Sequence, residues 1–175
     1  MPAQQLLDFW FGQDRKAWFE KNPAFDEQIR ARFLALYEQA AAGGLADWQH
    51  SPKSCLALVI LLDQFPRNMF RGTARAFAGD ALALAAARNI VERGWDKGMT
   101  EDERSFAYLP FEHSESLSDQ EDSLRLFAGQ ANFEWARRHW EIIRRFGRFP
   151  HRNAIFGRES TPEEIDFLKQ PGSGF

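Results

Sequence analysis

The sequence predicts an all-α fold in which antiparallel helical hairpins pack into a single domain over residues 1–175. Several segments repeat apolar residues with the 3.6-residue period of an amphipathic helix. Capping residues separate these segments, and the polar joints between them are too short to serve as domain linkers. No segment shows the alternation of polar and apolar residues that is typical of a β-strand. About six or seven helices joined this closely are expected to lie as antiparallel neighbours.

Two predicted helices in the first part of the chain supply the candidate core. The first has one apolar face, formed by Phe25, Ile29, Phe33, Leu36, Tyr37 and Ala40. The glycine pair at residues 43–44 ends it. Ser51 then predicts an N-cap with Pro52 in the first turn, and residues 55–62 are apolar on all sides, as in a buried central helix. We expect Pro66 to end this second helix or to bend it sharply.

Capping signals and glycines delimit the remaining helices. A helical stripe closed by Gly94 comprises Phe77, Ala81, Leu84, Arg88, Val91 and Trp95. Three pairs have the capping-box spacing of Ser or Thr followed three residues later by Glu: Thr100 with Glu103, Ser118 with Glu121, and Thr161 with Glu164. A further apolar face over residues 133–146 is broken by Gly147 and Pro150. These signals predict helix starts close to residues 101, 119 and 162.

Composition narrows the classes of function. Hydrophobic residues make up 44% and charged residues 27%, and the net charge of −3 provides no general attraction to nucleic acid or anionic lipid. The longest apolar run, residues 55–62, is too short to span a membrane, and the N-terminal segment lacks a secretory pattern. We therefore expect a cytoplasmic protein with neither a nucleic-acid nor a membrane partner.

Familiar catalytic motifs are absent from the sequence. It contains no glycine-rich phosphate loop, no GxSxG elbow and no HExxH zinc motif. Cys55 is the only cysteine, which excludes an internal disulfide and a cysteine zinc cluster, and its apolar surroundings favour inert packing. We expect no metal and no cofactor.

Three stretches are richer in polar groups than core packing requires: residues 63–71, 108–115 and 145–158. The first and third share Phe-Pro followed by Arg-Asn, then an aromatic residue and another Arg. Rigid guanidinium groups beside prolines suit the capture of a carboxylate or a phosphate. The predicted ligand-binding residues are Asp63, Arg67, Asn68, Arg71, Arg148, Arg152 and Asn153.

Two histidines in these stretches are candidates for proton transfer. His113 lies between Glu112 and Glu115, and His151 belongs to the third stretch. A histidine beside a carboxylate can act as a general acid or base near neutral pH. If the fold brings these stretches together, His113 or His151 would transfer the proton, and Glu115 would orient that histidine. The predicted catalytic residues are thus His113, Glu115 and His151, whereas His139 is expected to be structural.

The same polar residues also have a structural explanation. Prolines end helices, asparagines cap them, and arginines bind the free carbonyl groups at helix ends. Residues 101–122 hold eight acidic residues and one basic residue, whereas residues 137–158 hold seven arginines and one acidic residue. These two segments are expected to dock on one another. The acidic segment argues against a nucleic-acid site on the basic one.

The chain resembles a known family in seven segments that follow one another along nearly its whole length. They are LLDFWFG (6–12), WFEKNPAFD (18–26), LLDQFPRNMFRG (61–72), AFAGD (76–80), FAYLPFEHSE (106–115), SLSDQEDSLRLF (116–127) and RFGRFPHRNAIFGRESTPEE (145–164). In these segments it resembles domain of unknown function 924, an uncharacterised, mainly bacterial family, with Phe156 where leucine is expected. The resemblance implies a tetratricopeptide-like right-handed superhelix of helical hairpins, and it implies no reaction.

Three functions remain open at this point. The first is a binding module whose groove, lined by arginines and aromatic residues, takes an anionic small molecule or an acidic peptide. The second is a metal-independent enzyme that uses the His and Glu residues for acid–base catalysis on an anionic metabolite. The third is a purely structural or protein-interaction role, in which the Phe-Pro-Arg-Asn elements are helix-breaking corners. The sequence does not predict the oligomeric state.

Overall fold

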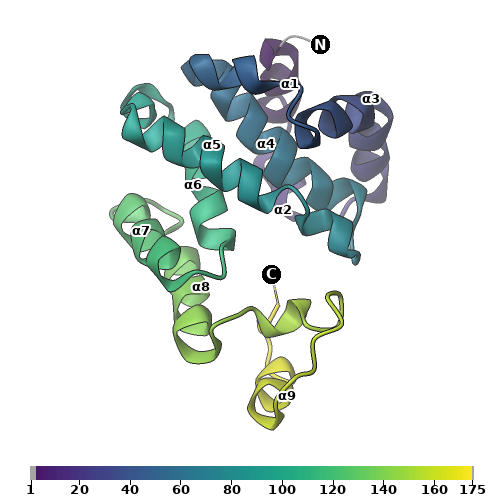
Figure 1. Ribbon diagram of the computed structural model, residues 1–175, viewed down its shortest axis with the longest axis vertical. Helices are drawn as coiled ribbons and strands as arrows, with labels where there is room; N and C mark the ends of the chain where they lie inside the picture. Colours follow the sequence, from purple (N-terminus) through teal and green to yellow (C-terminus); the bar gives the residue numbers. More distant parts are fainter. Residues whose placement is uncertain (1–2, 175) are drawn as a thin grey trace. The chain divides into compact units, whose positions relative to one another are not determined.

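The computed structural model describes residues 3–174, and all regular elements in this range are helical (Figure 1). The chain forms two compact units, an N-terminal unit of Met1–Arg71 with Arg75–Pro110 and a C-terminal unit of Phe111–Phe175 with Gly72–Ala74. The all-α prediction is confirmed, and one domain over residues 1–175 stays a prediction. None of the described helices is long and apolar enough to cross a membrane.

The N-terminal unit is built around one buried helix. Its elements are α1 (Ala3–Phe11), α2 (Arg15–Phe19), α3 (Pro23–Ala41), η1 (Ala46–His50), α4 (Pro52–Met69), η2 (Ala74–Phe77), α5 (Asp80–Glu92), η3 (Trp95–Gly98) and most of α6 (Glu101–His113). Helices α1, α3 and α5 pack against α4. Figure 1 shows α5 lying alongside α4. This arrangement explains why residues 55–62 are apolar on all sides.

The predicted core faces of α3 and α4 are confirmed. All six residues of the predicted α3 face are buried, and so is every residue from Cys55 to Leu62. Ser51 caps α4 by accepting a hydrogen bond from Ser54 N, with Pro52 in the first turn. Gly43 has a φ of 81°, which a side chain with a Cβ atom rarely adopts, so the chain turns there after α3 ends.

Pro66 does not end α4, which continues through it to Met69, and the alternative of a sharp bend stays a prediction. Proline lacks the N–H that would bond to the carbonyl of Leu62, four residues earlier. The backbone of Gly79 lies against this carbonyl, and a Cβ atom at Gly79 would stand only 2.3 Å from Leu62 O. After Pro66 the helical hydrogen bonds resume, with Phe70 N donating to Pro66 O at 2.9 Å. Gly79 thus packs closely against the Leu62 carbonyl, which receives no hydrogen bond from Pro66.

The buried face of α5 differs from the apolar stripe that we predicted for this helix. The buried residues are Ala83, Ala86, Ala87 and Ile90, whereas Ala81 is exposed and Leu84 is partly exposed. Alanines bring the backbones of α4 and α5 close together, so small side chains mark this interface. A search for large apolar residues therefore selects the wrong face.

Aromatic rings fill the remaining core of the N-terminal unit. The fully buried ring of Trp10 lies 6.2 Å from Trp18, 6.0 Å from Phe25, 5.6 Å from Phe65 and 5.4 Å from Phe106, measured between centroids. Trp18 Nε1 donates a hydrogen bond to Trp10 O at 2.9 Å. Offset and edge-on ring pairs of this kind add to the burial of apolar area. Much of the aromatic content of the chain therefore stabilises the fold.

The C-terminal unit contains the end of α6, α7 (Leu117–Phe127), α8 (Phe133–Phe146), η4 (Pro150–Arg152) and α9 (Pro162–Leu168). Helices α7 and α8 pack together. Thr161 and Glu164 form the predicted capping box of α9, and Thr100 with Glu103 forms the one before α6. The capping box predicted for Ser118 and Glu121 is wrong. Helix α7 begins at Leu117 with Ser116 as its N-cap residue, so Ser118 lies inside the helix.

Candidate functional site

The first polar stretch lies at the end of α4 in the N-terminal unit, where its arginines bind carboxylates of the chain. Arg67 donates two hydrogen bonds to Asp80, at 2.7 and 3.0 Å, and its Nη1 lies 3.3 Å from Asp63 Oδ1. Arg71 binds Asp26 through Nε and Nη2 at 2.6 and 2.9 Å. These predicted ligand-binding residues therefore hold helices together in the structure.

Asn68 and Asp63 take part in the same network. Asn68 Nδ2 donates to Asp26 Oδ1 at 2.8 Å, beside the Arg71 contact. Burial raises the pKa of Asp26, but the hydrogen bonds from Arg71 and Asn68 outweigh it and hold the pKa below the usual value. Asp63 is fully buried. Asp63 lies beside Arg67, but Arg67 and Arg71 are already bound to carboxylates of the chain.

The second and third stretches meet in the C-terminal unit. Gln120 of α7 donates from Nε2 to Glu112 O and to Ser114 O, both at 2.7 Å. Arg152 of η4 donates from Nη1 to His113 O at 3.1 Å. Because two side chains bind the free carbonyl groups where α6 ends, the backbone that carries His113 is held in one position.

Glu115 is engaged by the third stretch on both of its oxygens. Arg158 donates to Oε2 at 2.7 Å and to Oε1 at 3.0 Å, and Phe149 N donates to Oε1 at 2.8 Å. Burial raises the pKa of Glu115, but these hydrogen bonds outweigh it and keep the pKa below its usual value. Glu115 therefore stays ionised and ties the chain near residue 149 to the end of α6. Its described partners are these two groups, whereas we expected it to orient a histidine.

The pair of histidine and carboxylate in this unit is instead Glu112 with His139. His139 Nδ1 lies 3.1 Å from Glu112 Oε1 and 2.8 Å from Trp135 O, and both side chains are buried. Burial lowers the pKa of His139 to about 3, and the charges of His113, Arg152 and His151 act in the same direction. His139 is thus neutral at physiological pH, with its proton on Nδ1 facing two acceptors.

His139 was expected to be structural, and sequence reasoning missed its pairing with Glu112. The two residues are 27 positions apart on different helices, so no spacing rule connects them. The position of His139 four residues after Trp135 on a helix explains only the bond to the Trp135 carbonyl. A signal was nevertheless present in the acidic and basic segments that were expected to dock, because Glu112 belongs to the first and His139 to the second.

His113, His151 and Arg152 surround the same buried region. The centroid of the His113 ring lies 6.3 Å from that of His139. The ring of the fully buried Phe149 lies 5.6 Å from His139 and 5.7 Å from His151, and the guanidinium of Arg152 stacks on it at 4.5 Å. His113 and His151 are partly exposed, whereas Arg152 is buried. We call Glu112, His113, His139, His151 and Arg152 the histidine cluster.

The other predicted ligand-binding residues of this unit serve α9. Arg148 donates to both oxygens of Glu164, at 2.7 and 2.8 Å, and Asn153 Nδ2 donates to Glu164 Oε2 at 3.2 Å. The hydrogen bonds from Arg148, opposed by burial, lower the pKa of Glu164 to about 2. Arg148 and Asn153 thus stabilise the start of α9 through Glu164.

No group of three or more His, Cys, Asp or Glu side chains within residues 3–174 is arranged to hold a metal ion. The histidine cluster can donate and accept hydrogen bonds and can take up protons on its imidazoles. The guanidinium of Arg152 is positioned by buried contacts with His113 O and the Phe149 ring, which favours a fixed geometry over an adaptable one.

Comparison with known proteins identifies one family and one solved structure, both described as of unknown function. Residues 6–172 match the family described as bacterial protein of unknown function (DUF924). The solved structure of the protein of unknown function ATU0120 from Agrobacterium tumefaciens is similar, with a TM-score of 0.92 and 44% sequence identity. The similarity covers 95% of this chain and 96% of that one. No curated protein matches the chain.

Proposed function

This chain belongs to DUF924, a bacterial family of unknown function, and we propose that it is a binding protein for a small anionic molecule. The proposed site is the histidine cluster of the C-terminal unit. One observation carries the proposal: His113, His151 and Arg152 gather around the buried His139 and Phe149, so that two imidazoles and one guanidinium lie around the same buried region. Burial is the main cause of the low pKa of His139 and disfavours any charge there, whereas the smaller contributions of His113, Arg152 and His151 are positive and would attract an anion.

The balance of charges explains how an anion would be held. Next to the cluster, Glu115 is neutralised by Arg158, and inside it the carboxylate of Glu112 faces His139 and the guanidinium of Arg152 lies close by. The imidazoles of His113 and His151 come in addition to these balanced charges, and each can take up a proton. A bound anion is therefore expected to draw a proton onto His113 or His151, which makes the imidazole a charged donor.

The exposure of the cluster separates supporting residues from contacting ones. Glu112, His139 and Arg152 are buried and fix the geometry, whereas His113 and His151 are partly exposed and accessible to a ligand. The arginines that we first expected to hold the anion, Arg67 and Arg148 among them, are bound to carboxylates of the chain. We therefore propose that imidazole groups, and not these guanidinium groups, donate hydrogen bonds to the anion.

Isothermal titration calorimetry with inorganic phosphate and with malonate tests this proposal, at pH 6 and at pH 8. The wild type is expected to bind one of these anions more tightly at pH 6 than at pH 8, because protonation of an imidazole accompanies binding. His113→Gln and His151→Gln should abolish the pH dependence. His50→Gln is the matched control, because His50 is an exposed histidine of the N-terminal unit. Equal binding by all three variants, or no binding by the wild type, would contradict the proposal.

A second candidate function, metal-independent acid–base catalysis, is favoured by the contact between Glu112 and His139. The carboxylate and the Trp135 carbonyl hold the proton on Nδ1, so Nε2 keeps the lone pair that a general base needs. The low pKa of His139 argues against this role, because a base whose pKa is about 3 accepts a proton weakly at neutral pH. Binding without catalysis is therefore the preferred function.

An acidic peptide end offers the same carboxylate chemistry as a small anion, and the tetratricopeptide-like superhelix implied by the family would suit it. A protein-interaction role, or a purely architectural role of the arginine corners, would leave the histidine cluster without a ligand. We keep the cytoplasm as the proposed location.

A further inference from the structure

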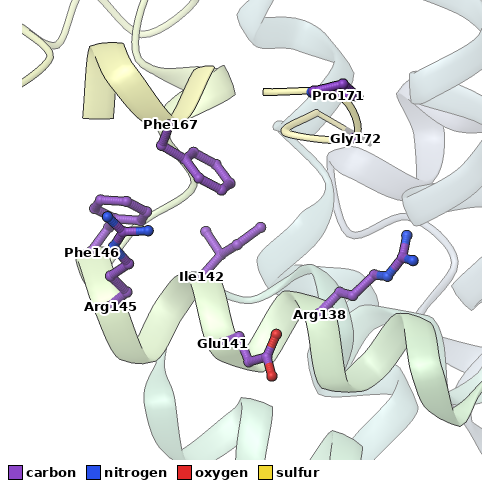
Figure 2. A pocket seen from close by; sticks show the side chains of 8 residues that line it. All are labelled: Arg138, Glu141, Ile142, Arg145, Phe146, Phe167, Pro171 and Gly172. Atoms are coloured by element: carbon purple, nitrogen blue, oxygen red, sulfur yellow. The ribbon is translucent and has the colours of Figure 1, made fainter. Parts of the chain in front are cut away.

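We propose that a second site in the C-terminal unit, a hollow between α8 and the segment that contains α9, binds an amphiphilic carboxylate. The hollow has a volume of about 300 Å³. Its lining residues, labelled in Figure 2, are Arg138, Glu141, Ile142, Arg145, Phe146, Phe167, Pro171 and Gly172. None of them belongs to the histidine cluster, so this inference does not depend on the proposed function.

The floor of the hollow is apolar. Ile142 is 7% exposed and belongs to a buried cluster with Ile143 and Phe149. Phe146 and Phe167 pack on this cluster, with ring centroids 5.1 Å apart and planes inclined by 50°. In Figure 2 the side chains of Ile142 and Phe167 point toward the open space between α8 and α9. A cavity near the lower end of the usual range for ligand sites, about 300–1,000 Å³, suits a small molecule with an apolar body.

The charged groups at the rim are not equivalent. Glu141 is bound by Arg137, and Arg145 is bound by Glu163 at 2.7 Å, so both have a partner of opposite charge. Arg138 takes part in no ion pair within residues 3–174, and its guanidinium stacks on the ring of Trp135 at 5.0 Å. The hollow therefore presents one guanidinium that no carboxylate of residues 3–174 neutralises.

The combination of an apolar floor and one such guanidinium defines the class of ligand. A carboxylate accepts two parallel hydrogen bonds from a guanidinium, and stacking on Trp135 limits the orientations of Arg138 before binding. A neutral apolar molecule would leave Arg138 without a carboxylate, and a small inorganic anion would leave the floor uncovered. An aliphatic chain that ends in a carboxylate satisfies both parts of the hollow.

Helix α8 offers a matched control in Arg144. Its guanidinium stacks on Trp140 at 5.1 Å, as that of Arg138 does on Trp135, and it takes part in no ion pair among the described residues. Both arginines are exposed. Arg144 does not line the hollow. The two variants Arg138→Gln and Arg144→Gln thus remove the same charge and the same kind of stacking from one helix.

Calorimetric titration of the full chain with octanoate, octanamide and acetate tests the site. Octanoate should bind the wild type and Arg144→Gln with equal affinity, and Arg138→Gln should weaken this binding roughly tenfold or more. Octanamide should bind weakly and equally to all three proteins, because it lacks the charge. Acetate should not bind at the same concentrations, because it lacks the apolar body. Unchanged melting temperatures of both variants would show that each is folded.

Three results would overturn the inference. The first is an absence of octanoate binding to the wild type at millimolar concentration. The second is an equal loss in Arg138→Gln and Arg144→Gln, which would reveal a general effect of charge. The third is a loss of octanoate binding in His151→Gln with full binding in Arg138→Gln, which would assign the carboxylate to the histidine cluster.

Discussion

Replacing Arg67 with methionine would remove the positive charge that faces two carboxylates at the end of α4. Arg67 contacts Asp63, which is fully buried, and Asp80, at 3.3 and 2.7 Å. Burial lowers the pKa of Arg67, but the charges of Asp63 and Asp80 outweigh it and raise the pKa above its usual value. Removing one partner of a buried ion pair leaves the other charge uncompensated, which costs about 3–5 kcal/mol. We expect a loss of that size in the free energy of unfolding.

Urea unfolding followed by far-ultraviolet circular dichroism measures this loss, and the melting temperature provides a second reading. At about 2–4 °C per kcal/mol for a chain of this length, the melting temperature should fall by roughly 6–20 °C. Arg15→Met is the control, because Arg15 and Asp102 form an ion pair in the same unit with side chains 68% and 35% exposed. This exposed pair should contribute only about 0.2–1 kcal/mol.

The reasoning would be refuted if Arg67→Met and Arg15→Met lowered the free energy of unfolding by the same amount. Asp63→Asn in the Arg67→Met background sharpens the test, because it removes the charge that is left buried. The double variant should be more stable than Arg67→Met alone. If the second substitution lowered the stability further, the loss in Arg67→Met would have to come from packing and not from an uncompensated charge.

Two further predictions concern backbone packing and pH. Gly79→Ala should destabilise the fold by about 1–3 kcal/mol in urea unfolding, because the new Cβ would stand 2.3 Å from Leu62 O. Gly98→Ala should be close to neutral, because a Cβ at Gly98 meets no atom within 4 Å, and equal effects would contradict this account. The pKa of Glu164 is lowered from 4.5 to about 2, so its stabilising contribution is present above pH 4.5 and is lost as the pH falls toward 2. Glu164→Gln should therefore show a smaller decrease of the urea midpoint over this interval than the wild type, and parallel decreases would exclude this role.

The sequence predicts those parts of the fold that depend on local physics. The core face of α3, from Phe25 to Ala40, follows from helical periodicity, and the caps at Ser51 and Thr161 follow from side-chain hydrogen bonding near the chain. Glycines with positive φ, such as Gly94 and Gly147, mark helix ends for the same reason. These features depend on residues within one or two turns of each other.

Features that depend on a distant partner could not be predicted in this way. The continuation of α4 through Pro66 involves Gly79, which packs against the carbonyl that proline leaves unbonded. The pairing of Glu112 with His139 joins two helices, and the choice of Glu115 as the partner of Arg158 depends on where the chain returns after α8. Glu112, Glu115 and Arg158 lie in the second and third polar stretches, whereas His139 lies outside all three stretches.

Two-dimensional NMR of the imidazole nitrogens, recorded during a titration with inorganic phosphate or malonate, tests the proposed anion site most directly. The four histidines of the chain report separately: His50 from the exposed surface, His139 from the buried pair, and His113 and His151 from the proposed contact surface. The account predicts that resonances of His113 and His151 shift toward the protonated form as anion is added, while those of His50 stay unchanged. Shifts at His50 equal to those at His113 and His151, or no shifts at all, would contradict it.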